Sequence, residues 1–142
     1  MPASAGAGCG WGKALREMVS SRRVLLVEDE VMVAMLLEDL LADMGCTVVA
    51  VASQIDAAMT AARTLEYDLA ILDVNLDGRE TYPVADVVAA RNLPSVFVTG
   101  YGPAGLRDAY RHLPVLTKPF READLRKIVA SALGAAAILP SG

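Results

Sequence analysis

The sequence predicts an α/β domain built on a doubly wound parallel sheet. From Arg22 onward, short apolar runs alternate with longer segments of helical period, and this alternation is typical of βα units. The apolar runs are nearly continuous, as expected of strands that are covered on both faces. The length of 142 residues suits one domain with a substantial core, and we expect no second domain.

The first strand is expected at residues 23–27. A helix with one apolar face follows it, and Gly45 ends this helix as the residue after the C-cap. The second strand, at 47–52, leads to a helix for which Ser53 and Asp56 resemble a capping pair. The apolar positions of these helices are Val33, Leu36, Leu37, Leu40, Leu41 and Met44, then Ile55, Ala58, Met59 and Ala62.

The third strand, expected at 68–73, leads through a loop, VNLDGRE, to a helix that Pro83 opens at its first position. The fourth strand, 95–99, precedes a weaker helix that opens at Pro103. A short fifth strand, 115–117, precedes the last helix, which makes five strands and five helices. The inward positions of the third and last helices are Val84, Val87 and Val88, then Leu125, Ile128, Val129 and Leu133.

Composition excludes several classes of function. A net charge of −4 argues against nucleic acid as a partner, because phosphate backbones require a basic face. No apolar run approaches the roughly 20 residues that span a bilayer, so we expect no membrane partner. Two cysteines, Cys9 and Cys46, do not make a disulfide framework, and the N-terminus lacks the apolar region of a secretory signal. We therefore expect a cytoplasmic protein.

Chemistry-bearing residues follow the expected strands. In open α/β sheets, ligands bind beyond the carboxyl ends of the strands, where this sequence has Glu28, Asp29, Asp73, Thr99 and Lys118. Carboxylates about 5 Å apart repel by roughly 3 kcal/mol per pair at an effective dielectric near 20, so the acids require a cation. Mg²⁺ prefers such oxygen ligands. We expect Asp29 and Asp73 to bind it directly and Glu28 to act through water.

The same residues indicate phosphoryl chemistry. Thr99 and Lys118 offer a hydroxyl and a cation to the oxygens of a phosphoryl group, which leaves Asp73 as the nucleophile that forms an acyl phosphate. Taken singly, each residue has an ordinary alternative: a solvated acid near a helix start, a turn cap, a locally bonded hydroxyl or a surface charge. Their coincidence at successive strand ends favours a joint site.

From Arg23 to about Leu133 the chain resembles the receiver domain of two-component response regulators. The motifs that carry the resemblance are VLLVEDE, LAILDVNLDG, VFVTGYG and LTKPF. VFVTGYG is similar to the motif of a subset of alphaproteobacterial single-domain regulators. The resemblance implies a flavodoxin-like fold with strand order 2-1-3-4-5 and a receiver domain at 22–134, between an N-terminal extension at 1–21 and a tail at 135–142.

The resemblance also implies roles for individual residues. Asp73 would accept a phosphoryl group from a phosphohistidine of a histidine kinase or histidine phosphotransferase. Mg²⁺ (or Mn²⁺) would also bind the backbone carbonyl of Asn75, and Thr99 and Lys118 would bind the phosphoryl oxygens. The bond between Lys118 and Pro119 would be cis. Such a protein is no enzyme beyond its own phosphorylation and slow dephosphorylation.

The sequence departs from the family at several places. The acidic pair is Glu28 and Asp29 where many members have two aspartates, and the loop after Asp73 is shorter than usual. Many members carry a switching Tyr or Phe where this chain has Val115. Tyr101 is therefore a candidate for part of the readout, and the alternative is an aromatic ring that merely caps the sheet edge.

The flanking segments raise further expectations. The residues after Leu133 are too few for an output domain, so we expect output by protein contact through the fourth helix, fifth strand and fifth helix. The protein could also form a homodimer, and the sequence does not decide this. In the extension, Trp11, Leu15, Met18 and Val19 lie at helical spacing, and we weigh disorder against a short amphipathic helix that docks or dimerises.

Two rival functions stay open at this stage. The first is a scaffold or pseudo-receiver that binds a kinase or regulator without being phosphorylated. The second is a hydrolase of small phosphorylated molecules, which would need a further acid or base and a cap. His112, the sole histidine, is expected away from the strand ends.

Overall fold

The computed structural model describes residues 13–138. Its centre is a five-stranded sheet in the order β2-β1-β3-β6-β7, and every neighbouring pair is parallel. The strands are β1 (Arg23–Val27), β2 (Thr47–Ala52), β3 (Leu69–Asp73), β6 (Ser95–Thr99) and β7 (Val115–Thr117). Counted along the sheet strands in sequence, this is the order 2-1-3-4-5, so the predicted fold is confirmed.

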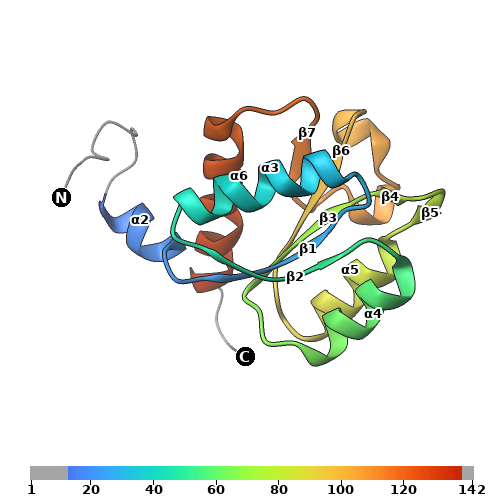
Figure 1. The fold of residues 1–142 in the computed structure, drawn as a ribbon, viewed down its shortest axis with the longest axis horizontal. Coiled ribbons are helices and arrows are strands. Elements are labelled where there is room, and N and C mark those ends of the chain that lie inside the picture. Colours follow the sequence, from blue (N-terminus) through green and yellow to red (C-terminus); the bar gives the residue numbers. More distant parts are fainter. Residues whose placement is uncertain (1–12, 139–142) are drawn as a thin grey trace.

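Helices cover both faces of the sheet, as a doubly wound fold requires. Figure 1 shows α3 (Val31–Asp43) and α6 (Glu122–Ile138) on one face and α4 (Ile55–Thr64) and α5 (Tyr82–Ala90) on the other. Each face has its own buried apolar cluster, one built around Leu26, Leu37 and Val129, the other around Leu72, Ala58 and Val88. None of the helices in the described part is long and apolar enough to cross a membrane.

The central strands are buried because their side chains are apolar on both faces. All residues of β3 and β6 are buried, and in β1 only Arg23 at the start is exposed. Strand β2 lies at the edge and is half-exposed. Burial stabilises the fold by roughly 1.5 to 3 kcal/mol for each large apolar side chain. This core fixes where the strands end, and therefore where the polar residues after them lie.

The prediction of an α-helix that opens at Pro103, after β6, is wrong. Two 3-10 helices, η1 (Gly102–Gly105) and η2 (Asp108–Tyr110), occupy the segment, and two extended residues, Leu106 and Arg107, separate them. Glycine disfavours a helix interior by about 1 kcal/mol relative to alanine. Gly105 also lies against Thr99: a Cβ at this position would approach the Thr99 Oγ1 to 2.8 Å. The described residues thus contain four long α-helices around the sheet instead of five.

The expected loop after Asp73 contains a small hairpin. Strands β4 (Asn75–Leu76) and β5 (Arg79–Glu80) pair antiparallel around Asp77 and Gly78. Both turn residues have positive φ, 50° and 85°, the conformation for which Asp-Gly is favoured in two-residue hairpins. The sequence carried this signal in NLDGRE, and the sequence interpretation missed it.

Helix α3 ends as predicted, and helix α4 begins differently from the prediction. Gly45 follows the C-cap of α3 with φ 86°, as expected of a glycine that ends a helix. The capping pair proposed for α4 is wrong, because Gln54 rather than Ser53 occupies the N-cap and no side chain bonds there.

A short helix, α2 (Lys13–Val19), precedes the sheet and packs against α6 (Figure 1). Val19 is fully buried and joins the apolar cluster of that face. The Cys46 thiol donates to the Val19 carbonyl at 3.4 Å, and the backbone N–H of Ser21 donates to the Gly45 carbonyl at 2.8 Å. Cys9 and Trp11 lie outside the described residues.

Candidate functional site

Three carboxylates meet at the carboxyl ends of two neighbouring strands. Glu28 and Asp29 follow β1, and Asp73 is the last residue of β3. One oxygen from each lies within 4.8 Å of the others. Glu28 and Asp73 are buried, with 2% and 8% of their surfaces exposed, and Asp29 is half-buried. The pairing of β1 with β3 brings the acids together, as the sequence predicted.

Backbone groups of the hairpin hold the two aspartates. The Asp29 Oδ2 accepts the N–H of Asp77 at 2.9 Å, and the Asp73 Oδ1 accepts the N–H of Asn75 at 3.4 Å. The buried Thr81 hydroxyl donates to the Asp73 carbonyl at 2.6 Å. The segment from Asn75 to Thr81 therefore braces both aspartates. Asp77 and Thr81 had no predicted role.

Lys118 reaches the acids from the end of β7. Its Nζ lies 3.6 Å from the Asp73 Oδ2 and 3.8 Å from the Glu28 Oε1, and it donates to the Glu30 Oε1 at 2.8 Å. Burial lowers the pKa of Lys118, but the hydrogen bond to Glu30 and the nearby carboxylates outweigh it and raise the pKa above its usual value. The bond from Lys118 to Pro119 is cis. Glu30 is a residue of the site that the sequence interpretation left without a role.

Thr99 lies at the end of β6, beside the strand that carries Asp73. Its neighbour Val98 is the register partner of Asp73, and Thr99 itself pairs with Thr117 on β7. The side chain is buried, and its Oγ1 accepts the backbone N–H of Tyr101 at 3.1 Å. The hydroxyl thus stands at the same sheet edge as the acids.

The remaining expected residues lie around this edge. Asn75 is exposed on the hairpin, and its side-chain Oδ1 accepts the Gly78 N–H at 2.8 Å. Tyr101 is 83% exposed, and its side chain is not part of the buried apolar clusters. Val115 is half-buried on β7. His112 is exposed in the segment before β7, which leaves the hydrolase alternative without a histidine among the clustered acids.

The buried acids resist full ionisation. Burial, together with the neighbouring Asp73 carboxylate, raises the pKa of Glu28 to about 7. Burial likewise raises the pKa of Asp73, although Lys118 opposes the shift. Crowded carboxylates away from water destabilise each other unless a cation joins them.

The residues present fit a divalent metal ion. The Glu28 Oε1 is buried without a hydrogen-bond partner within the described part of the chain, and buried polar atoms of this kind are rare. The other donors are carboxylate oxygens, the ligands that Mg²⁺ prefers. Glu28, Asp29 and Asp73 are the one acid cluster of ligand geometry found among residues 13–138.

Glu28 supplies a stability prediction for the metal-free protein. Because its folded pKa of about 7 exceeds the ordinary value of 4.5, its ionisation favours unfolding, and stability falls as pH rises from about 4.5 through about 7. Glu28→Gln removes the Glu28 share of this fall and leaves that of Asp73, whose pKa burial also raises, so in EDTA at pH 8 the free energy of unfolding should rise by on the order of 2 kcal/mol. Urea denaturation of the wild type and of Glu28→Gln at pH 5 and pH 8 measures the free energy of unfolding. If this free energy depended equally on pH in the two proteins, the prediction would be wrong.

Comparison with protein families agrees with this geometry. The model of the response regulator receiver domain matches residues 24–130. The transcriptional regulatory protein PdtaR of Mycobacterium tuberculosis is 32% identical over 108 residues, which cover 73% of this chain and 53% of PdtaR. The phyllosphere-induced regulator PhyR of Methylorubrum extorquens is 30% identical over 115 residues, covering 78% of this chain and 43% of PhyR. The chain thus spans about half the length of these curated relatives.

Solved structures share the fold and much of the length. The solution structure of SdrG from Sphingomonas melonis Fr1 has a TM-score of 0.69 and 37% identity, covering 84% of this chain and 98% of SdrG. The receiver domain of PhyR from Erythrobacter litoralis has a TM-score of 0.74 and 30% identity, covering 87% of this chain and 97% of that domain. The family match spans most of the chain and contains the acids, Thr99 and Lys118. The chain belongs to the response regulator receiver domain family.

Proposed function

We propose that this chain is a phosphorylation-dependent signalling protein of a two-component phosphorelay, in which Asp73 accepts the phosphoryl group. The observation that carries the proposal is the position of Asp73: its Oδ2 lies 3.6 Å from the Lys118 ammonium, within a cluster of two further carboxylates. A nucleophile, a cation and a metal-ligand set in contact are the parts that phosphoryl transfer requires.

The proposed reaction has two steps, transfer of the phosphoryl group to Asp73 and its later hydrolysis. A carboxylate oxygen of Asp73 attacks the phosphorus of a phosphohistidine; the new P–O bond forms as the P–N bond breaks, and the departing imidazole keeps the electron pair and takes a proton from solvent. Lys118 and the Thr99 hydroxyl bind the phosphoryl oxygens. Water later attacks the phosphorus, releases orthophosphate and regenerates the Asp73 carboxylate. Beyond this self-reaction we propose no enzymatic activity.

Asp29 and Asp73 would hold Mg²⁺ (or Mn²⁺), together with the backbone carbonyl of Asn75 and, through water, Glu28. When bound, the ion neutralises charge on the phosphoryl oxygens and on the crowded carboxylates. The Glu28 Oε1 supports this assignment, because within residues 13–138 it has no hydrogen bond and is a buried acceptor for a metal-bound water.

The experiment that tests the proposal is labelling of the purified chain by acetyl phosphate with Mg²⁺, followed on phosphate-affinity gels. The labelled residue is located by borohydride reduction and mass spectrometry. Labelling at Asp73 supports the proposal, whereas a chain that takes no label would support the scaffold alternative. Turnover of phosphate esters beyond one label per chain would instead revive the hydrolase.

The start of α3 offers a surface for the phosphoryl donor. Val31, Met32 and Met35 are 70%, 79% and 55% exposed, and α3 begins directly after Glu30. Glu30, directly before this face, bonds to Glu28 of the acid cluster, and large exposed apolar side chains are typical of protein contacts. We propose that the histidine kinase or phosphotransferase binds here.

Met32→Glu tests the donor surface. We expect phosphotransfer from the cognate kinase to slow roughly tenfold, because a charge replaces an apolar contact, while labelling by acetyl phosphate stays unchanged. Phosphotransfer profiling against histidine kinases would first identify that partner. Met32→Leu is the matched control. Equal slowing with both phosphoryl donors would place the effect inside the site and contradict a docking role.

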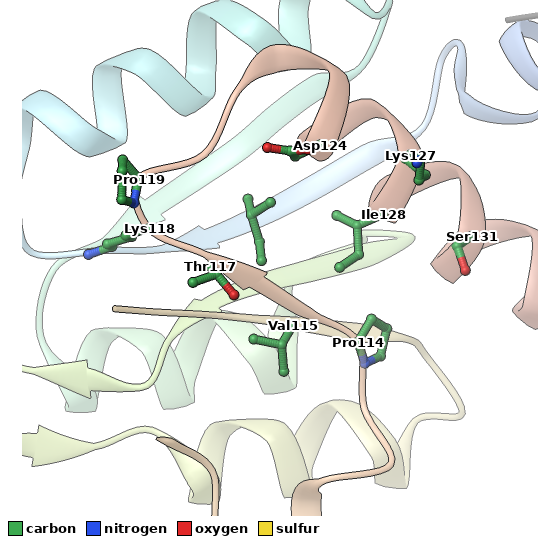
Figure 2. Close-up of a pocket in the computed structure, with 10 residues that line it drawn as sticks. Pro114, Val115, Thr117, Lys118, Pro119, Asp124, Lys127, Ile128 and Ser131 are labelled. Atoms are coloured by element: carbon green, nitrogen blue, oxygen red, sulfur yellow. The ribbon is translucent and has the colours of Figure 1, made fainter. Parts of the chain in front are cut away.

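The output surface is proposed on β7, α6 and the η1–η2 segment. A cavity of about 640 Å³ runs between β7 and α6, and Figure 2 shows Val115 and Ile128 on its walls, with Lys118 pointing away from Ile128. Lys118 therefore connects this groove with the acids, so a movement of Lys118 toward a phosphoryl group would alter the groove. Because Val115 provides no aromatic switch, Tyr101 remains our candidate for the readout.

A further inference from the structure

The closest partner of the Lys118 ammonium is the carboxylate of Glu30. Lys118 donates to the Glu30 Oε1 at 2.8 Å, whereas its distances to Asp73 and Glu28, 3.6 and 3.8 Å, exceed hydrogen-bond length. The Glu30 side chain is 60% exposed, and those of Glu28 and Asp73 are 1% and 10% exposed. Of the three acids near the ammonium, the one that holds it is therefore the one that faces solvent.

The backbone of Glu30 is fixed on both sides. Its N–H donates to the Glu28 Oε2 at 3.1 Å, and its carbonyl accepts the N–H of Ala34 at 2.9 Å in the first turn of α3. Glu30 stands at the N-cap of α3, but its side chain makes no capping hydrogen bond there. The carboxylate is instead directed to Lys118 from a fixed point beside the acid cluster.

We propose that Glu30 is a positioning residue, which holds the Lys118 ammonium in the resting state and releases it when Asp73 is phosphorylated. This inference rests on the proposed function. A phosphoryl group on Asp73 and the Glu30 carboxylate compete for the same cation, and Lys118 cannot keep its present geometry at Glu30 while it moves closer to Asp73. Because the pair with Glu30 is partly exposed, solvent weakens it enough for a buried dianion to displace it.

Glu30→Gln tests the competition. The variant should take label from acetyl phosphate with Mg²⁺ roughly 2- to 5-fold faster than the wild type, the factor expected from loss of one partly exposed ion pair. The affinity for beryllofluoride with Mg²⁺, a phosphoryl mimic that binds without a reaction, should rise by the same factor. An unchanged or slower rate would overturn the proposal.

Asp39→Asn is the matched control. Asp39 is exposed on the same helix, nine residues after Glu30, which corresponds to about 13 Å along the axis. The substitution changes the net charge by the same amount, so it should leave both measurements unchanged. If Asp39→Asn accelerated labelling equally, overall charge rather than Lys118 would be responsible, and the proposal would be wrong.

A double-mutant cycle separates positioning from direct repulsion of the phosphoryl anion. In a Lys118→Gln background, Glu30→Gln should no longer change the labelling rate, because the residue through which Glu30 acts is gone. A full 2- to 5-fold increase in that background would show that the Glu30 charge repels the phosphoryl group through space. That outcome would overturn the positioning role.

The two proposals can fail separately. If the wild type takes no label from acetyl phosphate, the proposed function fails, and Glu30 is then judged on beryllofluoride affinity alone, measured by ¹⁹F NMR. Equal affinities of wild type and Glu30→Gln would overturn the inference while leaving labelling at Asp73 untouched. Absence of both labelling and beryllofluoride binding would overturn both proposals.

Discussion

Asp73→Asn is expected to abolish labelling of the chain by acetyl phosphate in the presence of Mg²⁺. An amide oxygen is a far weaker nucleophile than a carboxylate and cannot form the acyl phosphate. The fold should survive, because the Thr81 hydroxyl bonds to the backbone carbonyl of residue 73 and the asparagine side chain has the same shape. Removing one charge from the acid cluster also relieves repulsion. Intact-protein mass spectrometry measures the label as one added phosphoryl group.

Asp77→Asn is the control for this substitution. Asp77 is exposed at the hairpin turn with φ 50°, a conformation that asparagine adopts readily, and it contributes its backbone rather than its side chain to Asp29. Labelling of this variant should match that of the wild type. Undiminished labelling of Asp73→Asn would move the nucleophile elsewhere, with Asp29 as the next carboxylate to replace.

Removal of Mg²⁺ should have the second largest effect. In excess EDTA, we expect the labelling rate to fall roughly 100-fold or more, because a metal ion contributes several kcal/mol to the stabilisation of a phosphoryl transition state. Mn²⁺ should restore the rate, since the donor set consists of oxygens. Labelling that proceeds equally well in EDTA would contradict the assignment of the acids to a metal.

Asp29 allows the metal site to be tested without chemistry. Asp29→Asn keeps an oxygen that can accept the Asp77 N–H, so the hairpin contact at 2.9 Å survives while the charge is lost. Calorimetric titration should show Mg²⁺ affinity at least roughly tenfold weaker, as the loss of even an indirect metal contact commonly causes. Asp29→Ala also removes the acceptor and should weaken binding further. Unchanged Mg²⁺ binding in both variants would exclude Asp29 as a ligand.

The sequence was sufficient for the sheet and for the residues at its carboxyl edge. Strands that are apolar throughout can be recognised without knowledge of tertiary contacts, because both of their faces must be buried. Once β1, β3, β6 and β7 are placed in parallel, the residues at the carboxyl end of each strand are placed too. This is why Asp29, Asp73 and Lys118 could be grouped correctly although they lie far apart in the sequence.

Features that depend on contacts between segments were predicted poorly. The segment from Gly102 to Tyr110 has a proline that can open a helix, but its glycines disfavour a helix interior, Gly105 lies against Thr99, and the chain forms two short 3-10 helices. The hairpin was overlooked although Asp-Gly indicated it. Glu30 had no distinguishing signal, since nothing in its neighbourhood of the sequence shows that a lysine 88 residues away points at it.

Helix α2 belongs to the folded unit although it precedes the residues that match the family. The family match begins at residue 24, yet Val19 is entirely enclosed, and its carbonyl accepts the Cys46 thiol. A fragment trimmed to the family limits would therefore open a hole at the amino-terminal edge of the sheet and lay the sulfur of Cys46 open to oxidants. The residues that cover this thiol therefore extend beyond residues 24–130, the range by which the family is recognised.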